Sequence, residues 1–182
     1  KIKKNITIPV NLEMAPTLEM LKIALKHKPN YVCIVPEKRK ELTTEGGLNL
    51  KKNYHSIKKI VKKLNLKKIR VSFFIEPNIK DVILAKKLGA KCVELHTGKY
   101  CRLFLEKKST KKAISRLHNA SSLAKEIGLE VHAGHGLTYK SIKPILRIKT
   151  ISELNIGHFI IAESLFVSLK NSIKKFKKII NQ

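Results

Sequence analysis

The fold is set by residues 130–137, EVHAGHGL, an apolar run that ends where two glycines enclose His135. Such a run is typical of a buried strand followed by a loop in which the backbone can approach a ligand closely. The pattern returns in residues 154–158, LNIGH. Taken alone, either segment is more simply explained as a tight turn with a hydrogen-bonded histidine. Because the loops after the last two strands of a strand–helix barrel often bind phosphate, the pair together favours a phosphate site.

Apolar strand-like segments alternate with amphipathic helical segments along the whole chain. Strands are predicted at residues 6–14, 31–35, 69–75, 92–98, from 129 onward, and at 153–156. Helices are predicted after Thr17 and at residues 54–64, 78–88 (ending at Gly89), 109–127 and 139–148. A closing helix is expected after the sixth strand. Its inner face would carry Leu165, Leu169, Ile173, Phe176 and Ile180.

Six strand–helix units of about 30 residues each require a parallel α/β sheet with right-handed crossovers. Eight units close a TIM (β/α)8 barrel in about 250 residues. We therefore expect a single domain, residues 1–182, formed by the C-terminal six units of a barrel whose first two units are missing. A doubly wound open sheet is the alternative, but no Gly-rich dinucleotide turn follows any strand.

The composition narrows the classes of function. The formal net charge is +26, which allows a basic nucleic-acid-binding protein as an alternative. However, 34 of the 39 basic residues are Lys, they are spread over all the helices, and aromatic residues make up 5% of the chain. Specific recognition of nucleic acid favours Arg and stacking aromatics, so we expect no specific nucleic-acid partner. The three cysteines form no CxxC pair and suit packing in a reducing cytoplasm, and no segment resembles a membrane span.

Polar residues collect at the predicted carboxyl ends of the strands, where the active site of a barrel lies. They are Asn11, Glu13, Glu94, His96, His132, His135, Asn155 and His158. A metal site is one interpretation, but His132 and His135 should point to opposite sides, so we expect no metal. The other is acid–base chemistry on a phosphorylated carbonyl compound. There Glu13 and His135 would move protons, and Gly136, Gly157 and His158 would hold the phosphate. The loop at residues 36–47 would serve as a mobile lid, and a solvated surface loop is the alternative.

Six segments together resemble the pyridoxine 5′-phosphate synthase family. They are residues 11–15 (NLEMA), 35–39 (VPEKR), 43–47 (TTEGG), 94–98 (ELHTG), 133–137 (AGHGL) and 155–158 (NIGH). The resemblance implies a (β/α)8 barrel in a homo-oligomer, commonly an octamer, without a cofactor. It implies condensation of 3-amino-2-oxopropyl phosphate with 1-deoxy-D-xylulose 5-phosphate to give pyridoxine 5′-phosphate, phosphate and water.

The same resemblance assigns roles to individual residues. Glu13 would be a catalytic base, His135 a proton donor, and Glu94 a further polar residue of the active site. Thr43 would contact the deoxyxylulose phosphate, while Gly136, Gly157 and His158 would hold the aminoketone phosphate. The family's first two strands have no counterpart in the chain. We therefore expect residues 1–182 alone to be poorly soluble and to make no detectable product without a complementing fragment.

Overall fold

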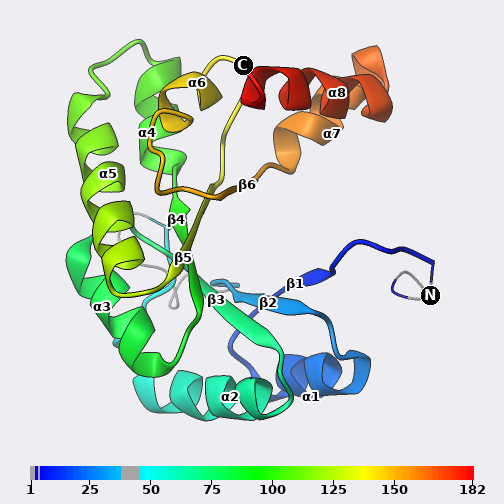
Figure 1. Ribbon diagram of the computed structural model, residues 1–182, viewed down its shortest axis with the longest axis vertical. Coiled ribbons are helices and arrows are strands. Elements are labelled where there is room, and N and C mark those ends of the chain that lie inside the picture. The colour runs from blue at the N-terminus through cyan, green and yellow to red at the C-terminus, as the bar shows by residue number, and fades with distance from the viewer. Residues whose placement is uncertain (1–2, 4, 38–45) are drawn as a thin grey trace.

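The computed structural model describes residues 3, 5–37 and 46–182. These residues form one sheet of six parallel strands with helices packed against it (Figure 1). In chain order the elements are β1 (Asn11–Met14), α1 (Leu18–His27), β2 (Tyr31–Ile34), α2 (Tyr54–Leu66), β3 (Arg70–Ile75), α3 (Ile79–Leu88), β4 (Cys92–His96), α4 (Gly98–Leu105), α5 (Lys111–Glu126), β5 (Glu130–Gly134), α6 (Ile142–Ile145), β6 (Glu153–Asn155), α7 (His158–Val167) and α8 (Leu169–Ile180).

The strands lie side by side in the order β1-β2-β3-β4-β5-β6, and each pairs with the next in parallel. A doubly wound sheet would reverse its order part-way across, so that alternative is wrong for this chain. Figure 1 shows the strands as an arc with α2, α3 and α5 on its outer side. The fold is therefore α/β, a partial barrel of six parallel strands, as the alternation of segments predicted.

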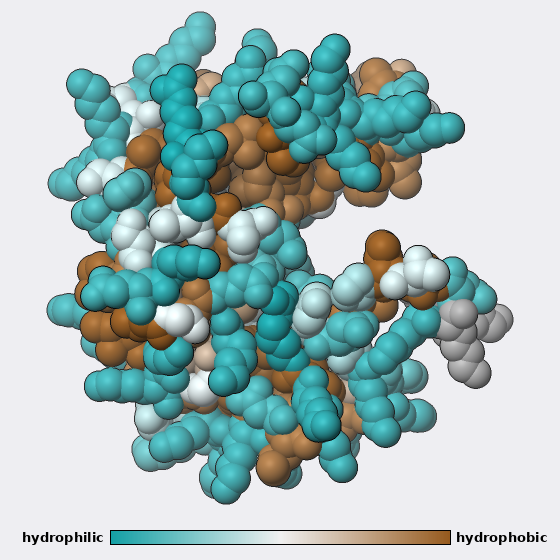
Figure 2. Space-filling view, in the orientation of Figure 1, coloured by the Kyte–Doolittle hydropathy of each residue, from teal (hydrophilic) through white to brown (hydrophobic). Residues whose placement is uncertain are grey.

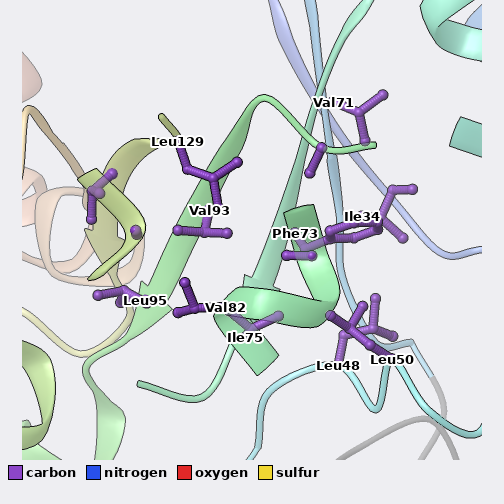
Figure 3. Close-up of a cluster of buried hydrophobic side chains, with 14 of the residues drawn as sticks. Ile34, Leu48, Leu50, Val71, Phe73, Ile75, Val82, Val93, Leu95 and Leu129 are labelled. Carbon is purple, nitrogen blue, oxygen red and sulfur yellow. The ribbon is translucent and has the colours of Figure 1, made fainter. Parts of the chain in front are cut away.

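The two faces of the strands carry different side chains, because successive residues of a strand point to opposite sides. On β3 and β4 the outward residues Val71, Phe73, Val93 and Leu95 are fully buried against the helices (Figure 3). The intervening residues of β4, among them Glu94, face the interior of the arc instead. One face of each strand thus forms the hydrophobic core, and the other is available for polar groups.

Several helix ends lie where the sequence placed them. The Thr17 hydroxyl accepts a hydrogen bond from the backbone N–H of Met20 at 3.2 Å and caps α1. The Asn78 side chain accepts from the N–H of Asp81 at 2.9 Å and caps α3. Helix α3 ends at Gly89, whose φ of +93° belongs to the left-handed region that glycine adopts without strain.

Three predicted boundaries need correction. The first strand begins at Asn11 rather than residue 6, and its pairing with β2 starts where Asn11 lies opposite Tyr31. Strand β4 ends at His96 rather than residue 98, and Gly98 instead opens α4, a helix that we did not predict. Between residues 139 and 148 the α-helix comprises a single turn, Ile142–Ile145, after a hydrogen-bonded turn at Thr138.

The predicted closing helix is also wrong as a single element. The backbone breaks at Ser168, whose φ is +70° and whose hydroxyl accepts from the N–H of Asn171, so that α7 ends and α8 begins there. Of the five residues expected on the inner face, Phe176 is buried, but Leu165 is 82% exposed. Figure 2 shows a deep hollow between the α7–α8 pair and the β1 side of the molecule, with apolar side chains along the wall beneath α7 and α8.

Two further observations concern the predicted lid and the membrane. Residues 38–45 of the predicted lid lie outside the described part of the chain, and Thr43 is among them. Among the described residues, no helix is long and apolar enough to cross a membrane.

Candidate active site

An open cavity of about 840 Å³ lies at the carboxyl ends of the strands. Parallel strands bring these ends to one rim, which is why residues far apart in sequence meet there. Six of the seven predicted site residues line this one cavity, and Thr43 lies outside the described residues. The lining comprises Asn11, Glu13, Val35, Pro36, Gly46, Phe74, Glu94, His96, His135, Gly136, Leu137, Leu154, Asn155, Ile156, Gly157, His158 and Phe159.

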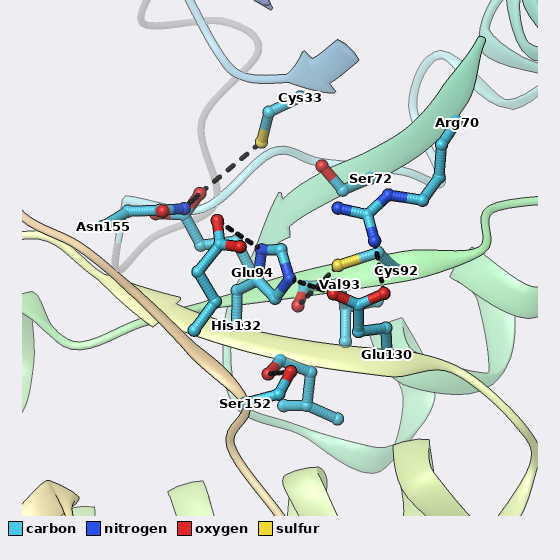
Figure 4. A network of polar contacts seen from close by, with 12 residues as sticks. Cys33, Arg70, Ser72, Cys92, Val93, Glu94, Glu130, His132, Ser152 and Asn155 are labelled. Carbon is cyan, nitrogen blue, oxygen red and sulfur yellow. Dashed lines mark hydrogen bonds and ion pairs between the residues drawn. The ribbon is translucent and has the colours of Figure 1, made fainter. Parts of the chain in front are cut away.

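Glu94 is the buried carboxyl group of the cavity. It points inward from β4 and is 5% exposed. Its Oε2 accepts a hydrogen bond from the Asn155 amide at 2.6 Å and a weaker one from the Cys33 thiol at 3.6 Å (Figure 4). Burial raises the pKa of Glu94 to about 7; the hydrogen bond from Asn155 opposes this rise, and the charge of Glu13 adds to it. Near neutral pH this carboxyl group can therefore either donate or accept a proton.

The position of Glu94 depends on a glycine in the neighbouring strand. A Cβ at Gly134 of β5 would lie 2.4 Å from Oε1 of Glu94 and 2.8 Å from the carbonyl oxygen of Asn155. No side chain fits there without displacing the carboxyl group or the β6 backbone. The glycine of the EVHAGHGL stretch thus makes room for a carboxyl group within the sheet.

Glu13 provides a second carboxyl group in a different environment. It lies on the edge strand β1, opposite Cys33 of β2, and is exposed while lining the same cavity. The cavity therefore combines a solvated carboxylate with a buried carboxyl group whose pKa is raised. Such a difference of environment is how two acidic groups take opposite acid and base roles at one pH.

His135 follows directly after β5 and has a backbone φ of +83°, which is unusual for a residue with a side chain. The Thr97 hydroxyl donates to the carbonyl oxygens of Gly134 and His135 and holds this turn against the end of β4. Burial lowers the pKa of His135, and the neighbouring His96 and His158 lower it further. An imidazole that lines a cavity is suited to exchanging protons with a bound substrate.

Gly136, Gly157 and His158 form another part of the cavity wall. Gly136 has a φ of +79°, so its conformation itself favours glycine. Gly157 differs, because its φ is −111° and a Cβ there would meet nothing within 4 Å. It precedes α7, whose first residue is His158, so the N–H groups at the start of this helix, which have no partner within the helix, border the cavity beside an imidazole. This arrangement suits an anion.

His96 and Glu76 make a contact that the sequence did not reveal. The His96 Nδ1 lies 3.0 Å from Oε1 of Glu76, and both side chains are buried. The ring of His96 also contacts the ring of His135, with 4.9 Å between centroids. The sequence marks His96 as a polar residue at a strand end but assigns a role to neither His96 nor Glu76. The register of β3 and β4 pairs Ile75 with Leu95, which places the next residues, Glu76 and His96, side by side.

Deeper in the arc, His132 belongs to a separate polar network (Figure 4). Its Nε2 lies 2.7 Å from Glu130, its Nδ1 lies 3.4 Å from Glu153, and Arg70 bonds the same Glu130. Donor atoms of Cys92, Glu130 and His132 lie within 4.8 Å of one another, the distance range of a metal site. However, Glu130 already pairs with both His132 and the Arg70 guanidinium, which repels a cation. His132 thus has its contacts in this network, whereas His135 lines the cavity.

Comparison with known proteins identifies the family. The family described as "Pyridoxal phosphate biosynthesis protein PdxJ" matches residues 1–182. A relative from Pelagibacter ubique, named "Pyridoxine 5'-phosphate synthase", is 54% identical over 182 residues, which are 100% of this chain and 76% of that protein. A relative of the same name from Zymomonas mobilis is 51% identical over 176 residues, 97% of this chain and 68% of that protein. A match along the whole chain, with relatives this similar, shows that the chain belongs to the pyridoxal phosphate biosynthesis protein PdxJ family.

Proposed function

We propose that the protein is a pyridoxine 5′-phosphate synthase that condenses 3-amino-2-oxopropyl phosphate with 1-deoxy-D-xylulose 5-phosphate. The products are pyridoxine 5′-phosphate, inorganic phosphate and water. The observation that carries this proposal is the shared cavity. This cavity contains two carboxyl groups in different environments, an imidazole of lowered pKa and the N-terminus of a helix. The chain is also 54% identical to a protein named for this activity.

The reaction needs proton transfers beside carbonyl groups. The amine of one substrate adds to the ketone of the other, phosphate leaves, and the ring closes with loss of water. Glu13, exposed at the cavity rim, is placed to remove protons from carbon or nitrogen. His135 donates a proton to the departing oxygen. Glu94, with a pKa raised to about 7, can hydrogen-bond a hydroxyl or carbonyl group in its neutral form and stabilise a positive charge once ionised.

The phosphate of the aminoketone is assigned to the wall formed by Gly136, Gly157 and His158. The N–H groups at the start of α7 and the helix dipole both favour negative charge there. The open space at Gly157 leaves room for phosphate oxygens to approach the backbone. Thr43 is assigned to the other substrate by the resemblance alone. Assembly into a homo-oligomer, a cytoplasmic location and the absence of a specific nucleic-acid partner also remain predictions.

The proposal can be tested by supplying both substrates and measuring pyridoxine 5′-phosphate by mass spectrometry together with phosphate release. Two samples are assayed. One contains residues 1–182 alone, and the other contains them co-expressed with the part of the Pelagibacter relative that the match leaves uncovered. Comparing the two samples shows whether the chain needs a complementing fragment for activity. Product and phosphate formed in equal amounts in the co-expressed sample, and lost in Glu13→Gln, are the expected result. Folded protein that makes no product in either sample would refute the proposal.

A further inference from the structure

The pair formed by Glu76 and His96 is a built feature of the cavity wall that the proposed mechanism does not use. Glu76 follows β3 and is 4% exposed, and His96 ends β4 and is 7% exposed. The His96 Nδ1 lies 3.0 Å from Glu76 Oε1, a hydrogen-bonding distance. Because His96 lines the cavity, one edge of its ring faces the site while the other is bound to a buried carboxylate.

Glu76 is held by more than His96. The backbone N–H of Gly47 donates to the same Oε1 at 3.0 Å, and the Arg116 guanidinium from α5 lies 3.8 Å from Oε2. Each of these groups can only donate, so the carboxylate acts as the acceptor toward all of them. The proton between Glu76 and His96 therefore belongs on Nδ1 of the imidazole. A carboxylate on one nitrogen in this way determines which tautomer a histidine adopts.

The ring has little freedom to leave this position. A Cβ at Gly46 would lie 2.8 Å from Cε1 of His96, and a Cβ at Gly98 would lie 2.6 Å from its Nε2. Phe74 packs edge-on against the ring at 4.9 Å between centroids. The imidazole thus occupies a slot between two glycines, with Nε2 on the side of Gly98. A Cβ at Gly98 would also lie 3.1 Å from Cδ2 of His135, so this side is the one that faces the proton donor.

We propose that Glu76 is a positioning residue that holds His96 in the Nδ1–H tautomer, so that the wall beside His135 presents a hydrogen-bond acceptor, Nε2, to the substrate. This inference rests on the proposed function for the identity of the substrate. A hydroxyl or amine N–H of a bound substrate can donate to Nε2, which fixes the reacting atoms relative to His135. Among the described residues, the charged and titratable groups around the two rings include Glu13, Glu76, Glu94, Lys99, Cys101, Arg116 and His158.

The tautomer can be read directly by long-range ¹H–¹⁵N NMR on the chain labelled with ¹⁵N-histidine and co-expressed with the complementing part of the Pelagibacter relative. The His96 signals are assigned with His96→Asn. We expect neutral His96 to carry its proton on Nδ1 in the unsubstituted protein. In Glu76→Gln, whose amide can either accept or donate, a substantial fraction of Nε2–H should appear. Arg116→Gln is the matched control, because the guanidinium lies near Oε2 of Glu76, while Oε1, the oxygen that faces His96, keeps its donor from Gly47; this variant should leave the tautomer unchanged.

The measurement needs no substrate and no turnover, so it succeeds or fails independently of the proposed function. An Nε2–H tautomer in the unsubstituted protein would overturn the inference even if Glu76→Gln does not fold. A folded Glu76→Gln variant that keeps the Nδ1–H tautomer would also overturn it. In the active protein, Glu76→Gln should lower kcat about tenfold or more, the usual effect of losing a partner that orients an active-site histidine, with KM changed less than kcat. An unchanged kcat would contradict the positioning role.

Discussion

Replacing Glu94 by Gln should remove a pH-dependent loss of stability. Burial raises the pKa of Glu94 from its ordinary value of 4.5 to about 7 in the folded protein. Between these two pH values the unfolded chain releases the proton while the folded chain keeps it, so the free energy of unfolding falls as pH rises. At about 1.4 kcal/mol for each pKa unit, the difference corresponds to about 3 kcal/mol. The loss is complete above pH 7 and absent below pH 4.5.

Urea unfolding of the unsubstituted protein and Glu94→Gln, repeated from about pH 4 to pH 8, measures this effect. The free energy of unfolding of the Gln variant minus that of the unsubstituted protein should increase by about 3 kcal/mol across that range. This increase is independent of the difference between the two proteins at low pH. Glu126→Gln is the control, because Glu126 is exposed on α5 and keeps its hydration on folding. Its curve should run parallel to that of the unsubstituted protein. A parallel curve for Glu94→Gln as well would refute the argument that burial of this carboxyl group is costly.

Four other measurements test the site and the proposed function. Glu13→Gln should lower turnover at least ~100-fold, and near-normal turnover would remove Glu13 from the mechanism. The same variant should lower the pKa of Glu94, because the charge of Glu13 helps to raise it, and ¹³C NMR of the carboxyl groups would show the direction. Gly157→Ala should fold normally, since its Cβ meets no protein atom, yet weaken phosphate binding measured by ³¹P NMR; unchanged binding would place the phosphate elsewhere. Finally, binding to nucleic acids at physiological salt should show no preferred sequence or structure, and a site bound ~1000-fold tighter than bulk nucleic acid would contradict the enzyme-only interpretation.

The parts of the fold that the sequence predicted are those set by local pattern. The alternation of apolar and amphipathic segments gave the strand order, and caps such as Thr17 and Asn78 gave helix starts. The site was predictable for a related reason. Parallel strands must bring their carboxyl ends together, so polar residues at those ends, such as Glu13, Glu94 and His135, had to share one rim.

The parts that the sequence did not predict depend on contacts between distant segments. Helix α4 was missed because its eight residues carry a short apolar pattern, and its buried Tyr100 is held by a hydrogen bond to the carbonyl of Ser141. The break at Ser168 replaced one long helix with two, which apolar periodicity alone does not reveal. The contact between Glu76 and His96 follows from the register of β3 with β4, and no local pattern encodes that register.

The division of each strand into two faces explains how the protein remains folded although burial of the Glu94 carboxyl group lowers its stability. Glu94 and His96 alternate along β4 with Val93 and Leu95, which are fully buried against the outer helices. Fully burying side chains of this size stabilises a fold by about 1.5–3 kcal/mol each, so the outer pair on β4 alone offsets a cost of about 3 kcal/mol at Glu94. The residues that stabilise the strand also fix the position of its backbone. The side chains on the inner face are attached to this same backbone and are therefore held in place as well. A carboxyl group of raised pKa can therefore stay where the chemistry needs it, because its neighbours one residue away hold the backbone in place.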